Sequence, residues 1–288
     1  MSNTTATTAS TKTTVTAKDW IMQHQLLTFF VMSYAIIFAA TFSSMWFNIP
    51  FLGVPWFLAV FSPTISALAI SAITGGMPAV KQLLQGYTRW KVSWRWYLGA
   101  LSLLLIPLAV ALIYKALGNQ TQGLAPGATA ASMLGQLIFT FFSGPFSEEA
   151  GWRGFALPRL QEKYNALVSS LILGVIWTCW HIPFYFHPDP ASRMFFPAYL
   201  ALNTVLTIFI TWLYNNTRGS LVIAILAHLA FNLVGGFVTG TLGLMGMNTL
   251  LMFGVPGLTI LLVWVLIYFG PRYLSRKPVA ELPFHPKA

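Results

Sequence analysis

Ionisable residues are scarce in this sequence of 288 residues, and acidic residues are the scarcest. Asp, Glu, Lys and Arg together make up 8% of the chain, with six acidic residues against 16 basic ones. Soluble domains carry about 25% charged residues, so this composition excludes an ordinary soluble globular fold. The chain is also 56% hydrophobic and 15% aromatic. These values predict an all-α fold, a polytopic integral membrane helical bundle.

Cysteine is almost absent as well. Cys179 is the single cysteine of the chain, which excludes an internal disulfide and any metal site built from several cysteines. The start of the chain lacks the hydrophobic run of a secretory signal, because residues 1–17 are mostly Thr, Ser and Ala. We expect residues 1–17 to form a disordered cytoplasmic tail.

Apolar stretches of about 20 residues, the length that crosses a bilayer, predict about eight transmembrane helices. We expect one membrane domain over residues 18–272 and a second cytoplasmic tail over 273–288. Residues 81–97, rich in Trp and Arg, favour an interfacial helix over a nucleic-acid surface, because spans flank them. The expected spans are 26–47, 54–73, 98–117, 133 through the Glu148–Arg153 stretch, 166–186, 198–214, 221–238 and 250–269.

The basic residues divide unevenly between the two sides of such a bundle. With eight spans, 14 of the 16 Lys and Arg residues lie on the side that carries both termini, and Lys115 and Arg193 lie on the other. Basic residues favour the cytoplasmic side. The pattern predicts that both termini are cytoplasmic, in the plasma membrane if the source is prokaryotic. The lipid bilayer is then the partner of the basic residues, and no nucleic acid is expected.

Two of the six acidic residues stand side by side inside an expected span, at Glu148 and Glu149. An ionisable group at membrane depth costs about 2.5–3.5 kcal/mol on insertion scales, so such groups face a protein interior and carry function. On a helix, residues four apart share a face, which places Glu149 beside Arg153. We expect Arg153 to neutralise Glu149 and to leave Glu148 free for chemistry.

Two histidines also lie inside expected spans, His181 and His228, and Asn232 shares a helix face with His228. Together with the two carboxylates, these groups suit the attack of water on an amide. A carboxylate and an imidazole can take the proton of the water. Imidazole and amide donors can stabilise the oxyanion that forms. Cys179 is a poor nucleophile for His181, because two residues apart on a helix point in different directions.

These residues carry a resemblance to a known family. Glu148-Glu149-Ala-Gly-Trp-Arg153 matches the EExxxR motif of the CPBP intramembrane glutamic endopeptidases, the CAAX-protease, bacteriocin-processing and Abi-like family that includes the Ras-converting endopeptidases. His181 matches the histidine of the family's FxxxH motif, with Trp177 in place of Phe. His228 and Asn232 match its HxxxN/B motif. The motifs occur in the family's order over residues 148–232.

The resemblance implies an intramembrane endopeptidase that needs no metal. Glu148 and His181 would activate the water, and His228 and Asn232 would form the oxyanion hole. Arg153 would hold Glu149 in place. The substrate would be a membrane-associated protein or peptide, which in some members is lipidated.

Three other readings of the same residues stay open. Glu148, His181 and His228 could instead bind zinc, since two histidines and a carboxylate form a common catalytic zinc set. Intramembrane Glu and His also build the proton relays of transporters, although the sequence shows no internal repeat of the transporter type. A non-catalytic membrane scaffold could keep the same fold.

Overall fold

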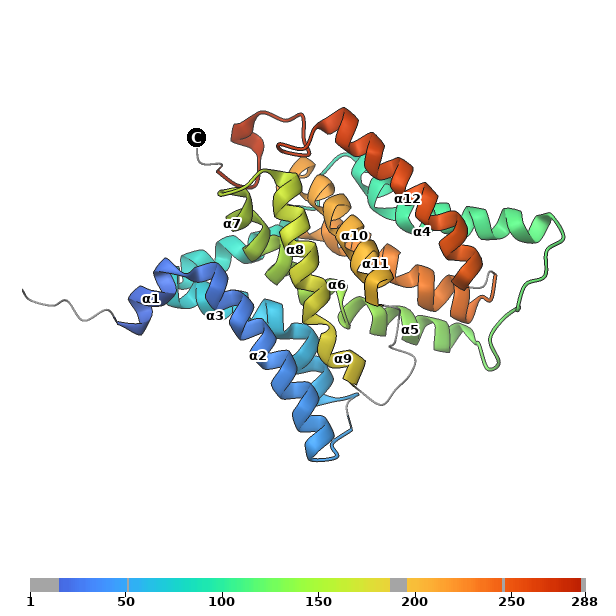
Figure 1. Ribbon diagram of the computed structural model, residues 1–288, viewed down its shortest axis with the longest axis horizontal. Helices are drawn as coiled ribbons and strands as arrows, with labels where there is room; N and C mark the ends of the chain where they lie inside the picture. The colour runs from blue at the N-terminus through green and yellow to red at the C-terminus, as the bar shows by residue number, and fades with distance from the viewer. Residues whose placement is uncertain (1–15, 51, 187–195, 245–246, 286–288) are drawn as a thin grey trace, which may run out of the picture.

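A computed structural model describes residues 16–50, 52–186, 196–244 and 247–285. For residues 247–254 it describes the backbone alone. The described residues are helical and contain no strand. Figure 1 shows α8, α10 and α11 in the middle of the molecule, with α2 and α3 to one side and α4 and α12 to the other. The elements are α1 (Ala17–Gln23), α2 (Gln25–Trp46), α3 (Val54–Leu84), η1 (Gln85–Thr88), α4 (Trp94–Ala116), α5 (Ala130–Phe142), α6 (Pro145–Glu149), η2 (Ala150–Ala156), α7 (Leu157–Gln161), α8 (Ala166–Trp180), α9 (Ile182–Phe186), α10 (Phe196–Asn216), α11 (Leu221–Leu233), η4 (Val234–Thr241), α12 (Met247–Phe269) and η5 (Val279–Glu281).

The polytopic helical membrane fold is confirmed. Among the described residues, six helices are long and apolar enough to cross a membrane. They cover residues 25–46, 54–88, 94–116, 166–186, 196–216 and 221–241. The last expected span, 250–269, corresponds to α12. The part of α12 whose side chains are described, residues 255–269, is apolar but shorter than a full span. The predictions for residues 1–15 and 286–288 concern positions outside the described residues.

The fourth expected span is not one continuous helix. Its residues form α5, α6, the π-helix η2 and α7, with a break at Ser143 and Gly144. Pro145 at the start of α6 has no backbone N–H and cannot continue the hydrogen bonding of α5. The π-helical turn that follows is a form often found at functional sites. The break therefore separates Glu148 from the apolar helix α5 that precedes it.

The prediction that residues 81–97 form one interfacial helix is wrong. The structure divides this segment among the end of α3, the 3₁₀ turn η1, a non-helical link and the first turns of α4. Trp90 in the link and Trp94 at the start of α4 are 56% and 65% exposed. The segment keeps its aromatic, basic surface without forming a helix of its own.

Close helix packing in the core depends on small residues. A Cβ on Gly151 of η2 would lie 2.5 Å from Pro63 of α3, and one on Gly174 of α8 would lie 2.9 Å from Thr204 of α10. Small residues let helices in a membrane approach closely, since van der Waals packing drives their association. Gly151 thus brings the helical turn that follows Glu148 and Glu149 directly against α3.

The segment that follows α12 folds back onto the bundle. The Asn215 and Asn216 side-chain amides of α10 donate to the Tyr273 and Leu274 carbonyls, at 2.8 Å in each case. Leu274, Leu282 and Phe284 are buried. Part of the segment 273–285 therefore packs against the end of α10, whereas the sequence predicts a cytoplasmic tail over 273–288.

Candidate active site

Three separate parts of the chain supply the candidate residues. Glu148 and Glu149 end α6, which Thr64 of α3 anchors by donating to the Ser147 carbonyl at 2.6 Å. Arg153 lies on η2 and His181 caps the C-terminus of α8. His228 and Asn232 lie on α11, whose first turn is capped by the Ser220 hydroxyl. All six candidate residues lie between α6 and α11 in the chain.

Glu149 connects two of the motifs through one oxygen. Its Oε1 accepts a hydrogen bond from Arg153 Nη1 at 2.7 Å and contacts His228 Nδ1 at 2.8 Å. Glu149 and Arg153 are fully buried. The pairing of Glu149 with Arg153 appears in the structure as the spacing predicts. The contact with His228, 79 residues later, ties α6 to α11 and was not evident from the sequence.

The environment of Arg153 is incompletely hydrogen bonded. Among the described residues, Arg153 Nε and Nη2 and Glu149 Oε2 find no hydrogen-bond partner. The guanidinium carbon lies 4.4 Å from the centre of the Trp177 ring. A cation over an indole face is attracted by the negative charge of the ring face, which compensates part of the missing hydrogen bonding.

Glu148 presents its two oxygens to different surroundings. Oε2 accepts hydrogen bonds from the indole nitrogens of Trp177, at 2.6 Å, and Trp152, at 3.2 Å. Oε1 points to the other side, toward Gly144. A Cβ built on Gly144 would lie 3.4 Å from Glu148 Oε1, 3.2 Å from Asn232 Nδ2 and 3.6 Å from His228 Nε2. Three side-chain atoms from two helices therefore lie close to Gly144, each within contact distance of the position that a Cβ there would take.

His181 is linked to this group through Trp177. Its Nδ1 lies 2.8 Å from the Trp177 carbonyl oxygen, and its ring meets that of Tyr199 edge to face at 5.3 Å. A carbonyl accepts only, so Nδ1 carries the proton and the neutral ring keeps a lone pair on Nε2. Among the described residues, no hydrogen bond joins His181 directly to Glu148.

The described part of the chain contains no cluster of side chains that could bind a metal ion. No three His, Cys, Asp or Glu side chains there are grouped closely enough to hold one ion. Cys179 is a free thiol, partly buried on α8.

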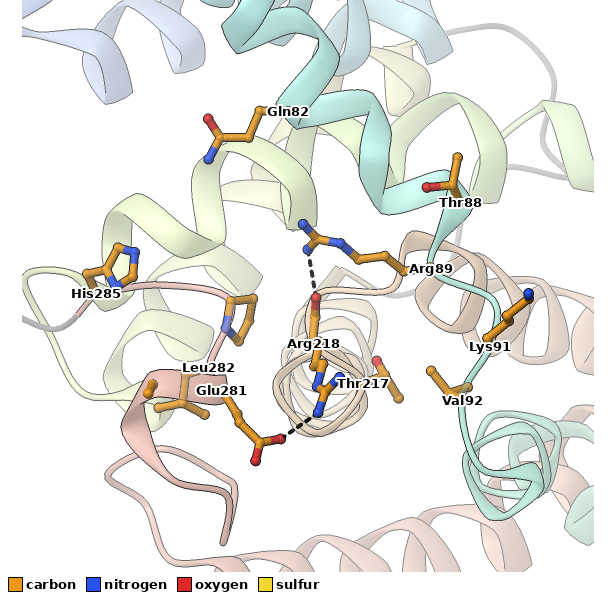
Figure 2. Close-up of a pocket in the computed structure, with 12 residues that line it drawn as sticks. Gln82, Thr88, Arg89, Lys91, Val92, Thr217, Arg218, Glu281, Leu282 and His285 are labelled. Carbon is orange, nitrogen blue, oxygen red and sulfur yellow. Dashed lines mark hydrogen bonds and ion pairs between the residues drawn. The ribbon is translucent and has the colours of Figure 1, made fainter.

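One cavity lies away from the candidate residues. It has a volume of about 590 Å³ and is lined by η1, the link after it, the turn between α10 and α11 and the C-terminal segment. Figure 2 shows Arg89 at its centre, donating to the Arg218 carbonyl at 2.6 Å. The Arg218 side chain pairs with Glu281 at 3.1 Å, and this hydrogen bond lowers the pKa of the Glu281 carboxyl. None of the six candidate residues lines this cavity.

Comparison with known proteins places the candidate site in a family. Residues 130–234 match the family model described as Type II CAAX prenyl endopeptidase Rce1-like. This region is therefore similar to the CAAX prenyl endopeptidases. It runs from α5 to the start of η4 and contains all six candidate residues.

A curated protein similar to this region is CAAX prenyl protease 2 of Methanococcus maripaludis. The two sequences are 32% identical over 104 residues, which is 34% of this chain and 38% of the relative. The match thus covers less than half of the relative's length.

Sequence reasoning missed three features of the site. Gly144 and the indole donors Trp152 and Trp177 surround Glu148, and Glu149 contacts His228. The position of Trp152, four residues after Glu148, was a usable signal, because such residues share a helix face. Nothing in the linear sequence points to Gly144 as the residue next to Asn232.

Proposed function

We propose that this protein is an intramembrane endopeptidase that hydrolyses a peptide bond of a membrane-associated protein or peptide. The observation that carries the proposal is the convergence of Glu148 Oε1, His228 Nε2 and Asn232 Nδ2 within 3.6 Å of one point beside Gly144. A carboxylate oxygen and two potential donors around one point suit a water molecule and a scissile carbonyl.

In the proposed mechanism Glu148 takes a proton from water as the oxygen attacks the peptide carbonyl carbon. The carbonyl π electrons move to its oxygen, and the Asn232 amide stabilises the resulting oxyanion. The intermediate then collapses, the C–N bond breaks and the proton passes to the leaving amine. His181 assists by accepting a hydrogen bond from the water at Nε2, since its Nδ1–H is bonded to the Trp177 carbonyl.

The proposed role of His228 depends on its protonation. Glu149 Oε1 already accepts a hydrogen bond from Arg153, so His228 Nδ1 carries a proton and donates a second hydrogen bond to the same oxygen. Nε2 then donates to an oxyanion only when the ring carries both protons. A carboxylate on Nδ1 stabilises such an imidazolium, as in serine protease triads. Glu149 therefore acts through His228, and Arg153 acts through Glu149.

The substrate class follows from the matched relative as a proposal. That relative is named a CAAX prenyl protease, so a peptide ending in a prenylated Cys-a-a-X sequence is the first substrate to test. The proposed topology has both termini in the cytoplasm, because 14 of the 16 basic residues lie on the side of the termini in a chain of eight spans. A prokaryotic source would place the protein in the plasma membrane.

The test compares Glu148→Gln with Glu162→Gln in purified protein. Both variants remove one carboxylate and keep the shape of the side chain, but Glu162 lies in the turn that follows α7. We expect Glu148→Gln to abolish cleavage of a farnesylated Cys-a-a-X peptide and to leave thermal stability nearly unchanged. Glu162→Gln should cleave like the wild type. Turnover by Glu148→Gln would reject Glu148 as the base.

A chelator separates the glutamate mechanism from a zinc mechanism. Both histidines donate Nδ1–H to an acceptor, an arrangement that also orients histidines bound to metals. The glutamate mechanism predicts full cleavage in EDTA or phenanthroline. Loss of cleavage with recovery on added zinc would instead assign Glu148, His181 and His228 as ligands. A transporter or scaffold would show no cleavage that depends on Glu148.

A further inference from the structure

Two tryptophans hold the proposed catalytic carboxylate from one side. Trp177 of α8 donates to Glu148 Oε2 at 2.6 Å, and Trp152 of η2 donates to the same oxygen at 3.2 Å. Trp152 is fully buried and Trp177 is 1% exposed. The rotation of a Glu carboxylate about its last torsion is otherwise broad. Two donors on one oxygen fix this rotation and direct Oε1 to the point beside Gly144.

Resting on the function proposed above, we propose that Trp177 and Trp152 are positioning residues that present Glu148 Oε1 to the reacting water. Trp177 has the larger part, because it also accepts His181 Nδ1–H at its carbonyl oxygen and lies under the Arg153 guanidinium. The motif that this segment resembles has Phe at the position of Trp177. A Phe ring could supply the stacking face but has no N–H to donate.

Trp180 provides a matched control on the same helix. Its side chain is fully buried, and its indole donates to the Ser62 hydroxyl at 3.1 Å instead of to Glu148. We expect Trp177→Phe to lower kcat about tenfold to hundredfold, the effect of losing one hydrogen bond to a charged group. Trp152→Phe, with the longer bond, should lower kcat less, and Trp180→Phe should stay close to the wild type.

The expected signature is a fall in kcat with KM unchanged, because neither indole binds substrate. Benzothienylalanine at position 177 keeps the shape of Trp and lacks the N–H, so it should lower kcat as Phe does. Full kcat with this isostere would overturn the role of the N–H.

Glu148→Gln is measured in parallel. If it retains turnover, the proposed function fails. If Glu148→Gln is inactive and kcat falls by the same factor in Trp177→Phe and Trp180→Phe, the proposed function stands and the positioning role of Trp177 fails.

A second, independent observation concerns the cavity of about 590 Å³ in Figure 2. Its described lining includes the cations Arg89, Lys91 and Arg218, and its one carboxylate is Glu281. Glu281 is already engaged with Arg218 and with Lys277, which lies at 3.5 Å. Positive charge therefore exceeds negative charge in the lining, as an anion site requires.

The surroundings of this cavity point to a lipid as the source of the anion. Trp90, next to Arg89 in the chain, is 56% exposed, and Trp94 is 65% exposed. Exposed Trp residues beside a span are typical of the membrane interface. Basic pockets at that level on the cytoplasmic side bind the phosphates of lipid head groups. We infer that this cavity binds the phosphate of an anionic phospholipid head group.

The test uses the full chain in detergent with added phosphatidylglycerol, phosphatidylcholine or inorganic phosphate. We expect phosphatidylglycerol to raise the melting temperature and to stay bound in native mass spectrometry, more than the other two. Lys91→Gln and Arg89→Gln should each lose this binding. Arg95→Gln is the control, since Arg95 is exposed in the same segment and does not line the cavity.

Lys91→Gln keeps the test valid if Arg89→Gln fails to fold, because it leaves the bond from Arg89 to the Arg218 carbonyl in place. Equal retention of phosphatidylglycerol by Lys91→Gln and Arg95→Gln would overturn the site. Equal stabilisation by inorganic phosphate would show that a free phosphate is the ligand and overturn the lipid assignment.

Discussion

Replacing Arg153 by Ala removes the cation from a fully buried charge group. Arg153 Nη1 and His228 Nδ1 share Glu149 Oε1, at 2.7 and 2.8 Å. After the change, the Glu149 carboxylate stays buried, and His228 is its remaining hydrogen-bond partner among the described residues. Removing one member of a buried ion pair typically costs about 3–5 kcal/mol, because the other charge is left uncompensated. Arg153→Ala should therefore lose a large part of the stability of the fold.

The assay is thermal unfolding in detergent, with expression level and peptide cleavage per folded molecule measured beside it. A loss of this size corresponds to a fall in melting temperature of roughly 10 °C, by the scaling for domains of similar length. Arg159→Ala is the matched control. Arg159 is partly buried and donates to Gln25 Oε1 at 3.0 Å and to the Phe155 carbonyl at 2.9 Å. Among the described residues it forms no salt bridge like that of Arg153 with Glu149. The melting temperature of Arg159→Ala should fall by much less than that of Arg153→Ala.

A double variant separates the stability role from the chemistry. Glu149→Gln with Arg153→Met removes both charges, so stability should recover much of what Arg153→Ala loses. Cleavage should stay low, because the imidazolium form of His228 loses its anionic partner. An Arg153→Ala protein that melts like the wild type and is nonetheless inactive would refute this reasoning and place Arg153 in the chemistry.

Three further outcomes are expected. Cysteine labelling should place both termini and residues 78–95 in the cytoplasm and residues 118–130 outside, and termini on opposite faces would reject the eight-span topology. Gly144→Ala should lower kcat strongly, because its methyl group would lie 3.2 Å from Asn232 Nδ2 and 3.4 Å from Glu148 Oε1. Gly135→Ala, with open space at its Cβ, is the control and should keep full kcat. Asn232→Ala should keep measurable cleavage, since His228 still donates to the oxyanion, and complete loss in a folded protein would make Asn232 the sole donor.

The sequence by itself determined the membrane class and the pairing of Glu149 with Arg153. Low charge and long apolar runs leave few alternatives to a helical bundle, because backbone groups in lipid must be hydrogen bonded within the segment. The pairing is local, four residues along one helical face. The same local logic failed for residues 81–97, where the pattern of Trp and Arg predicts membrane depth but does not fix where one helix ends and the next begins.

The tertiary structure decided which groups meet. Glu149 reaches His228 across 79 residues, Trp177 reaches Glu148 across 29, and Gly144 lies beside Asn232. Such contacts depend on how α6, α8 and α11 pack. The break at Ser143 and Gly144 and the close approach of Gly151 to Pro63 help to set this packing. Helical periodicity carries no information about distances between helices. The residues of the candidate site were therefore readable from sequence, whereas the oxygen that each donor contacts depended on the packing.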